Sequence, residues 1–208
     1  MKEYPKINSI FKRDAGGKFI EGNYSCPEFE FLAGNKWVWT EKVDGTNVRV
    51  MWDKEVSKLR FGGRTDNAQF LTSLYECLCG LFPLELFKDK ETMCLYGEGY
   101  GAKIQKGGGN YKKDGVGFVL FDILMGNWWL KRDAIEKIAE EMGIECVPIA
   151  GEGTLSEAIL LTQGGFKSKW GDFTAEGLVL KPAVELTARN GNRIITKVKC
   201  RDFGEINR

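Results

Sequence analysis

The chain has 208 residues, of which 43% are hydrophobic and 28% charged, a balance typical of a globular protein and not of a disordered or membrane-embedded one. Its net charge of +1 gives the chain as a whole no strong attraction for nucleic acid. It contains no histidine, which excludes Ser-His-Asp and Cys-His nucleophile systems, histidine-ligated zinc sites and imidazole acid–base catalysis. Any chemistry must therefore use Lys, Arg, Asp, Glu, Tyr or Cys.

The predicted elements mix strands and helices. In chain order, the sequence predicts strands at residues 36–43 and 47–52, a helix at 70–78, strands at 91–97 and 117–124, a helix at 134–142, a helix between the capping box Thr154–Glu157 and Gly164, and strands at 177–181 and 192–200. Strands outnumber helices and do not form a regular βαβ series, so we predict an α+β fold with antiparallel sheets. The length predicts a single domain, residues 1–208.

The cysteines, the start of the chain and the apolar segments indicate the cellular compartment of the protein. The six cysteines form no CxxC pair, and the start MKEYPKINSIFKRD has charges where a signal peptide needs an apolar stretch. The most apolar run, 116–130, is interrupted by Asp122 and Asn127 and is too short to span a bilayer. We therefore expect a cytoplasmic protein with free thiols and no membrane partner.

Lys42 in EKVDG is the first candidate for chemistry, because it stands at the end of an apolar strand directly before a turn. Alone it is equally well read as a solvated strand end. It is followed by GGRTDN, LYGEGYG, VLFDIL, AEGLVLKP and ITKVKC, which contain Arg64, Glu98, Phe121, Glu176, Lys197 and Lys199. In this order the segments resemble the six collinear motifs of the covalent nucleotidyltransferases, namely polynucleotide ligases and mRNA capping enzymes.

Two further features narrow the resemblance. Thr46-Asn47 follows the lysine motif, and GEGYGAKIQ is followed by Tyr111. Both resemble the RNA-ligase-2-like family, which implies an ATP-dependent RNA ligase with an ATP-grasp-like adenylation domain of antiparallel sheets flanked by helices. Lys199 in the last motif lies nine residues before Arg208, so we expect no carboxyl-terminal OB or helical domain. An accessory protein or domain for substrate engagement is then a candidate partner.

The resemblance also implies a role for each motif residue. Lys42 would be the nucleophile, and Lys197 and Lys199 would contact the nucleotide phosphate. Phe121 would stack on adenine, Glu98 would bind the ribose hydroxyls, and Glu41 and Val43 would line the nucleotide site. Asn47 and Arg64 would bind the phosphates and the reacting RNA ends, and Glu176 would hold Mg²⁺ or Mn²⁺. Asp44 would orient Lys42 or hold a metal-bound water.

The residues themselves support part of this scheme. Lys197 and Lys199 are two apart on a predicted strand, so both leave the same face and form either a phosphate clamp or a protected sheet edge. Phe121 alone is read more simply as a core residue. Gly97 and Gly99 on either side of Glu98 indicate close backbone approach to a ligand. A hard cation such as Mg²⁺ prefers carboxylate oxygens, as in Glu176.

The implied mechanism needs an unprotonated amine, whereas a free lysine has a pKa of about 10.4. Neighbouring cations disfavour the ammonium form, and Arg64, Lys197, Lys199 and Mg²⁺ are the candidates. By resemblance, Lys42 would attack the α-phosphate of ATP to form lysyl-AMP. AMP would then pass to an RNA 5′-phosphate and leave when a 3′-hydroxyl attacks.

Residues 101–115 carry four lysines against one aspartate, which suits contact with an RNA backbone but also a merely solvated glycine-rich loop.

Two other functions stay open. One is a DNA nick ligase or capping-type guanylyltransferase, and the other is a non-catalytic nucleotide-binding module.

Overall fold

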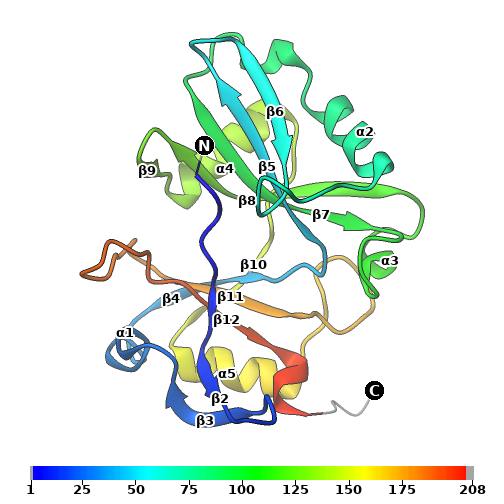
Figure 1. The fold of residues 1–208 in the computed structure, drawn as a ribbon. Coiled ribbons are helices and arrows are strands. Elements are labelled where there is room, and N and C mark those ends of the chain that lie inside the picture. The colour runs from blue at the N-terminus through cyan, green and yellow to red at the C-terminus, as the bar shows by residue number, and fades with distance from the viewer. Residues whose placement is uncertain (1, 205–208) are drawn as a thin grey trace. The chain divides into compact units, whose positions relative to one another are not determined.

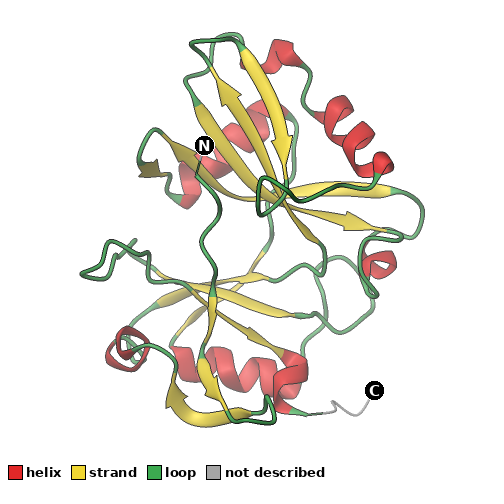
Figure 2. Cartoon of the chain, viewed as in Figure 1, coloured by secondary structure: helices red, strands yellow, loops and turns green. Residues whose placement is uncertain are grey.

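A computed structural model describes residues 2–204, which divide into two compact units (Figure 1). The first unit is Asp44–Val147 with the segment that ends at Pro5. The second is Lys6–Val43 with the chain from Pro148 onward. Both units combine antiparallel sheet with a few helices, as the α+β prediction requires (Figure 2).

The first unit is built on one antiparallel sheet of five strands in the order β6-β5-β7-β8-β9. Its strands are β5 (Thr46–Asp53), β6 (Lys58–Gly62), β7 (Met93–Gly101), β8 (Val116–Met125) and β9 (Trp128–Trp129). Its helices are α2 (Thr72–Leu81), the 3-10 turn η1 (Leu84–Phe87), α3 (Gly108–Tyr111) and α4 (Arg132–Met142).

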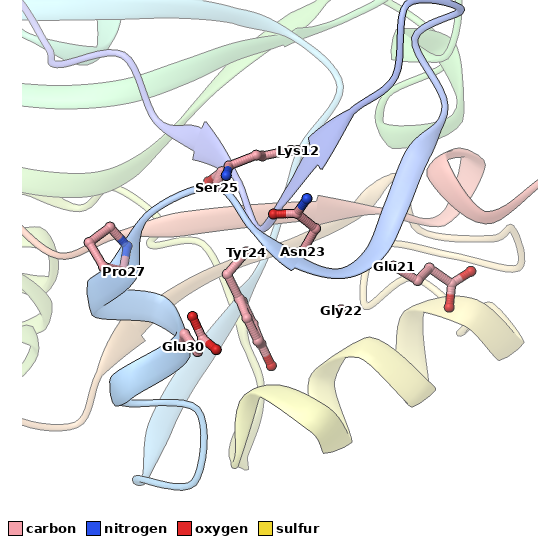
Figure 3. Close-up of a pocket in the computed structure, with 8 residues that line it drawn as sticks. All are labelled: Lys12, Glu21, Gly22, Asn23, Tyr24, Ser25, Pro27 and Glu30. Atoms are coloured by element: carbon pink, nitrogen blue, oxygen red, sulfur yellow. The ribbon is translucent and has the colours of Figure 1, made fainter.

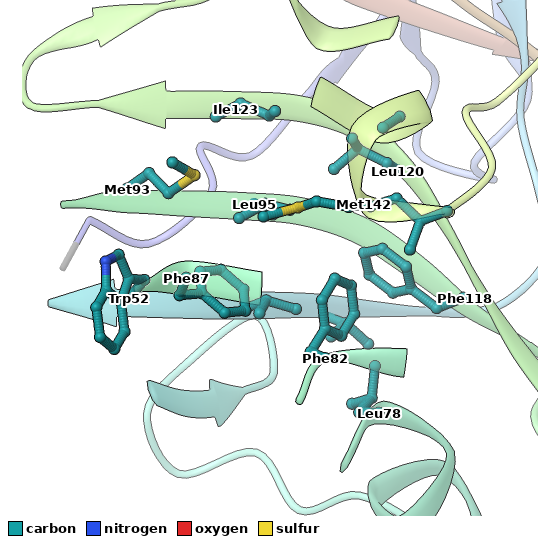
Figure 4. Close-up of a cluster of buried hydrophobic side chains, with 14 of the residues drawn as sticks. Trp52, Leu78, Phe82, Phe87, Met93, Leu95, Phe118, Leu120, Ile123 and Met142 are labelled. Atoms are coloured by element: carbon teal, nitrogen blue, oxygen red, sulfur yellow. The ribbon is translucent and has the colours of Figure 1, made fainter. Parts of the chain in front are cut away.

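The two faces of this sheet differ because side chains alternate along each strand. One face carries Val50, Leu95 and Phe118, and it is covered by Leu78 of α2 and Met142 of α4 in the core that Figure 4 shows. The opposite face carries a polar set that is paired across the strands, with Asn47 opposite Glu98, Arg49 opposite Tyr96, and Tyr96 opposite Asp122.

The amino-terminal segment of this unit binds the polar face of the sheet. The Tyr4 hydroxyl donates to the Asp122 carboxylate over 2.6 Å, and the Tyr96 hydroxyl donates to the Lys2 carbonyl over 2.7 Å. The polar groups of β7 and β8 are thereby satisfied where the face is buried.

The second unit contains a five-stranded sheet in the order β1-β12-β11-β4-β10 and a separate hairpin. The sheet strands are β1 (Asn8–Ser9), β4 (Trp37–Glu41), β10 (Ile149–Gly153), β11 (Gly177–Pro182) and β12 (Thr196–Lys199), and the hairpin is β2 (Phe11–Arg13) with β3 (Phe19–Tyr24). All sheet pairs are antiparallel except β1 with β12. The helices are α1 (Pro27–Phe31), α5 (Leu155–Gly164) and the 3-10 turn η2 (Cys200–Phe203).

Helix α5 runs along one face of this sheet, where Leu155 packs with Trp37, Leu178 and Val198 (Figure 1). Its start is the predicted capping box: the Glu157 amide donates to the Thr154 hydroxyl over 3.3 Å, and the Thr154 amide donates to the Glu157 carboxylate over 2.7 Å. The helix ends one residue later than predicted, with Gly165 as its C-cap.

The predicted strands are all present, but some details differ. The details that differ include the start of β12, which is Thr196 and not residue 192, and the bounds of α2, which are 72–81 and not 70–78. Strands β1, β2, β3, β6, β9 and β10 and the short helices α1 and α3 were not predicted. The six cysteines are unpaired. Among residues 2–204, every helix is too short or too polar to cross a membrane.

Candidate active site

Lys42 directly follows β4, whose sequence WVWTE alternates between the two faces of the sheet. Trp37, Trp39 and Glu41 are buried, and Lys42 leaves on the opposite side with Thr40. The Lys42 amide donates to the Gly177 carbonyl over 2.9 Å, which continues the pairing of β4 with β11 beyond the last strand residue. The backbone thus directs the Lys42 side chain away from the core.

Glu176 bridges two lysines. Its Oε2 accepts from Nζ of Lys42 over 2.7 Å, and its Oε1 pairs with Nζ of Lys199 over 2.6 Å. The side chains of Lys42, Glu176 and Lys199 are 21%, 12% and 18% exposed, so all three are largely withdrawn from water. One carboxylate between two ammonium groups leaves this trio with a net charge of +1, which favours the binding of an anion.

Gly177 makes this bridge possible. It lies opposite Lys199 in the register of β11 and β12, and a Cβ at this position would stand 2.1 Å from the Val198 carbonyl oxygen. Only glycine permits the two strands to approach so closely. The Cys200 amide also donates to the Glu176 carbonyl over 2.9 Å. The start of β11 is therefore held beside the end of β12, where Lys199 stands.

Lys197 and Lys199 share one face of β12, as predicted, because Thr196, Val198 and Cys200 are buried on the other. Lys197 is partly buried and lies opposite Val179 of β11. The face of the sheet that turns away from the α5 core thus carries Lys42, Lys197 and Lys199.

Glu41 and Val43 flank Lys42, and both side chains are buried. The Glu41 carboxylate accepts from the Ser168 hydroxyl over 2.6 Å and from the Lys169 amide over 2.8 Å. Burial raises the pKa of Glu41, although these hydrogen bonds oppose the rise. The Glu41 side chain therefore fixes the 168–169 segment, and only the backbone of Glu41 and Val43 is available to a nucleotide.

Asn47 and Glu98 face each other across β5 and β7 in the first unit. The Asn47 Oδ1 atom is buried and has no hydrogen-bond partner among residues 2–204, which leaves an acceptor for a ligand or water. The turn before Asn47 lies against Glu98, since a Cβ on Gly45 would stand 2.8 Å from Glu98 Cγ and 2.2 Å from the Gly99 carbonyl oxygen. The motif turn and Glu98 are therefore in contact.

The glycines beside Glu98 have a packing reason that the sequence analysis did not predict. A Cβ on Gly97 would stand 2.2 Å from the Phe118 ring, and one on Gly99 would stand 2.7 Å from Leu74. Both close approaches are to the core face of the sheet, opposite Glu98. These glycines therefore make room for core side chains, and the predicted close approach of a ligand beside Glu98 stays a prediction.

Phe121 lies at a β-bulge. Tyr96 pairs with Asp122 and Gly97 pairs with Leu120, so Phe121 is the extra residue between them. Its ring is half-buried and contacts Tyr4 edge to face, with ring centroids 5.0 Å apart. The bulge thus takes Phe121 out of the regular alternation of β8.

Arg64 is exposed in the loop after β6, and this loop is held by Arg49 of β5. The Arg49 side chain is completely buried; its Nε donates to the Gly63 carbonyl over 2.7 Å and its Nη2 to Asp66 over 2.6 Å. Arg49 was not predicted, although a lone arginine inside the apolar strand VRVMW indicates a buried polar contact.

The predicted site residues are divided between the two units. Lys42, Glu176 and Lys199 are in direct contact in the second unit, which also contains Lys197, Glu41 and Val43; the first unit contains Asn47, Arg64, Glu98 and Phe121. The Glu176 bridge was not predicted.

The donor set around Glu176 does not match a resident metal ion. Both of its oxygens are engaged by lysines, and residues 2–204 contain no group of three or more carboxylate or cysteine ligands that could hold a metal. A metal role for Glu176 requires that at least one lysine be displaced.

A separate pocket in the second unit has a different chemical character. It lies at the β2–β3 hairpin and α1, and its lining consists of Lys12, Glu21, Gly22, Asn23, Tyr24, Ser25, Pro27 and Glu30 (Figure 3). None of the motif residues lines it, and its two glutamates are unsuited to phosphate. The Lys42–Glu176–Lys199 cluster is therefore the better candidate for a phosphate site.

Solved structures with this fold include several of Naegleria gruberi RNA ligase. A mutant in the apo form matches with a TM-score of 0.66 at 19% identity over 95% of this chain and 57% of that one. The protein with PPi matches at 0.66 and 20% identity over 96% and 62%, and a mutant with ATP and Mn at 0.67 and 20% over 95% and 61%. The chain thus has the fold of these enzymes and spans about 60% of their length.

The sequence profile of the family described as RNA ligase matches residues 35–199. This range begins before β4 and ends at Lys199, so it includes every predicted site residue from Glu41 to Lys199. On this evidence, the chain belongs to the RNA ligase family.

Proposed function

We propose that this chain is an ATP-dependent RNA ligase in which Lys42 is the nucleophile. The observation that carries the proposal is the cluster in which Glu176 joins Lys42 to Lys199, inside the region that matches the family. Naegleria gruberi RNA ligase, which shares the fold, has been solved with ATP and Mn and with PPi. These ligands support ATP as the nucleotide and pyrophosphate as the first product.

The first step forms a bond between Lys42 Nζ and the α-phosphorus of ATP and breaks the bond from that phosphorus to the pyrophosphate oxygen. The amine must lose a proton to attack, and Glu176 Oε2, at 2.7 Å, is within reach to accept it. Lys199 is then free to stabilise the charge that develops on the phosphate oxygens. AMP next passes from Lys42 to the 5′-phosphate of RNA, and a 3′-hydroxyl displaces it to form the phosphodiester.

The other motif residues bind the nucleotide and the RNA ends. Phe121 stacks on adenine, Glu98 binds the ribose hydroxyls, Asn47, Arg64 and Lys197 contact phosphate, and Glu41 and Val43 contribute their backbone. Two observations support these roles: the ring of Phe121 is half-buried, and the Oδ1 of Asn47 has no hydrogen-bond partner in the described part of the chain. In this proposal residues 1–208 act as one adenylyltransferase domain.

The divalent cation, Mg²⁺ or Mn²⁺, enters with ATP as part of the substrate. When bound, it neutralises phosphate charge during the transfer. Among the chain's residues, Glu176 is the proposed ligand; it takes this role while it is ionised and once the nucleotide phosphates replace it as partner of Lys199. The free cysteines suit a cytoplasmic location, and an accessory protein or domain remains a proposed partner for RNA engagement.

Intact-mass spectrometry after incubation with ATP and Mg²⁺ tests the proposal. The wild-type chain gains the mass of one AMP, whereas K42A and the charge-conserving K42R gain none. An equal gain in K42A would place the adduct elsewhere and refute Lys42 as nucleophile. An adduct with GTP alone would indicate a capping-type enzyme, and sealing of DNA nicks but not RNA would indicate a DNA ligase.

A further inference from the structure

The loop 102–115 is a structured element of the first unit. The Ala102 amide donates to the Gly115 carbonyl over 2.9 Å and closes the loop at its base. Ile104 is 6% exposed and packs into the core that Figure 4 shows in part. Gly108 lies so close to Gly101 that a Cβ on it would stand 2.2 Å from the Gly101 carbonyl oxygen. The loop is therefore anchored at its base and along its length.

Asp44 of the KVDG motif holds the middle of this loop. Its Oδ2 accepts a hydrogen bond from the Gly107 amide over 3.2 Å. A Cβ on Gly107 would stand 2.8 Å from the same oxygen, so glycine is needed for this approach. Asp44 lies two positions after Lys42 in the sequence, and its side chain is directed to the loop.

The loop carries four exposed lysines, one of which also bonds to the backbone beside the loop. Lys103, Lys106, Lys112 and Lys113 are all exposed, and Asp114 is the only acidic residue between positions 102 and 115. Nζ of Lys112 donates to the Val116 carbonyl over 2.9 Å, while the Tyr111 ring contacts Tyr100. An anchored loop thus presents a concentrated positive charge on a chain whose net charge is only +1.

We propose that loop 102–115 binds the phosphates of the RNA strand and that Asp44 is the positioning residue that holds it. This rests on the proposed function, because it identifies the surface that engages the RNA substrate of that reaction. Anchoring lowers the entropy that the loop would lose on binding, and lysines on phosphates give affinity without base specificity.

The first test measures the affinity for a 5′-phosphorylated RNA oligonucleotide, without ATP, over a range of salt concentrations. The variant replaces Lys103, Lys106 and Lys113 by alanine. We expect weaker binding and a reduction of about 2 in the slope of log affinity against log salt, since each phosphate contact on a single strand contributes about 0.7. The control replaces Lys58, Lys88 and Lys137, three exposed lysines of the same unit, and keeps the wild-type slope. Equal slopes for the loop variant and the wild type would overturn the proposal.

The second test examines Asp44 with D44A and D44N. Asparagine keeps an acceptor for the Gly107 amide, whereas alanine removes it. We expect D44A to show faster hydrogen exchange at Gly107 and several-fold weaker RNA binding, with both restored in D44N. Wild-type RNA affinity in D44A would refute the positioning role.

The proposed ligase activity and the proposed RNA-binding loop can be refuted separately. The AMP adduct of the wild-type chain tests the ligase chemistry and involves no RNA. If no adduct forms while the loop variant loses RNA affinity, the proposed function fails and the loop surface stands. If the adduct forms and the loop variant binds RNA normally, only the loop proposal fails.

Discussion

Nζ of Lys42 lies 2.7 Å from Oε2 of Glu176, a residue 134 positions later in the chain. The proposed nucleophile is thus paired with a carboxylate that simultaneously neutralises Lys199. Without Glu176, the two ammonium groups would repel each other in a setting that water reaches only partly.

Glu176→Gln removes the charge and keeps the size of the side chain. We expect the free energy of unfolding to fall by about 2 kcal/mol, less than for a fully buried pair because all three side chains retain some exposure. Formation of the AMP adduct should slow as well, because glutamine cannot take a proton from Lys42. Urea unfolding and timed mass spectra measure the two effects. Asp172→Asn, which removes an exposed ion pair with Lys167, is the control and should change neither. Wild-type stability in Glu176→Gln would show that the bridge has no energetic role.

Arg49→Met removes the buried guanidinium that holds the Arg64 loop. The Gly63 carbonyl loses its donor, so we expect a loss of about 1 to 3 kcal/mol in the free energy of unfolding. Hydrogen exchange should also accelerate at amides 63–68. Arg60→Met, an exposed change on the neighbouring strand, serves as the matched control. Unchanged exchange in the Arg49 variant would mean that the loop holds its conformation without this side chain.

Tyr4 supports the bulge at Phe121 through a hydrogen bond to Asp122 and a ring contact with Phe121, and two variants separate these contacts. Tyr4→Phe loses the hydrogen bond to Asp122 but keeps the ring, so we expect reduced stability, by about 1 to 2 kcal/mol, with little change in the ATP concentration needed for adduct formation. Tyr4→Leu also loses the edge-to-face contact with Phe121, and this concentration should rise. The prediction fails if both variants need the same ATP concentration as the wild type.

Glu41 makes stability depend on pH in the opposite sense to an ordinary ion-paired carboxylate. Its pKa is raised by burial above the usual 4.5, so the native state holds its proton more tightly than the unfolded state. This contribution is fully present below pH 4.5 and is lost as the pH rises through the native pKa. Relative to Glu41→Gln, the wild type should therefore lose stability on going from pH 4.5 toward neutrality. Parallel urea-unfolding profiles for the two proteins would contradict this.

The sequence predicted those features that depend on local periodicity. The same-face placement of Lys197 and Lys199 follows from a two-residue repeat, and the start of α5 follows from the Thr154–Glu157 box. Neither requires knowledge of distant residues. The strand β10, with sequence IAGEG, has too few apolar residues to show this repeat and was missed.

Features that depend on distant contacts could not be predicted. The Glu176 bridge exists because Gly177 lets β11 approach β12, and nothing in AEGLVLKP alone shows which strand is its neighbour. The bulge at Phe121 is likewise set by pairing with β7. The packing of Gly97 and Gly99 against Phe118 and Leu74 also depends on distant residues, and the segment LYGEGYG alone does not show it.

The position of Glu176 has a consequence for ligand selection. Its Oε1 atom already pairs with Lys199, where a phosphate would bind, so an incoming anion must compete with this carboxylate oxygen for Lys199. A single phosphate or sulfate offers little advantage over that carboxylate. A triphosphate can also engage Lys197 and is better able to displace it. We therefore expect inorganic phosphate at cellular concentrations to inhibit the protein only weakly, a form of substrate discrimination that is built into its resting state.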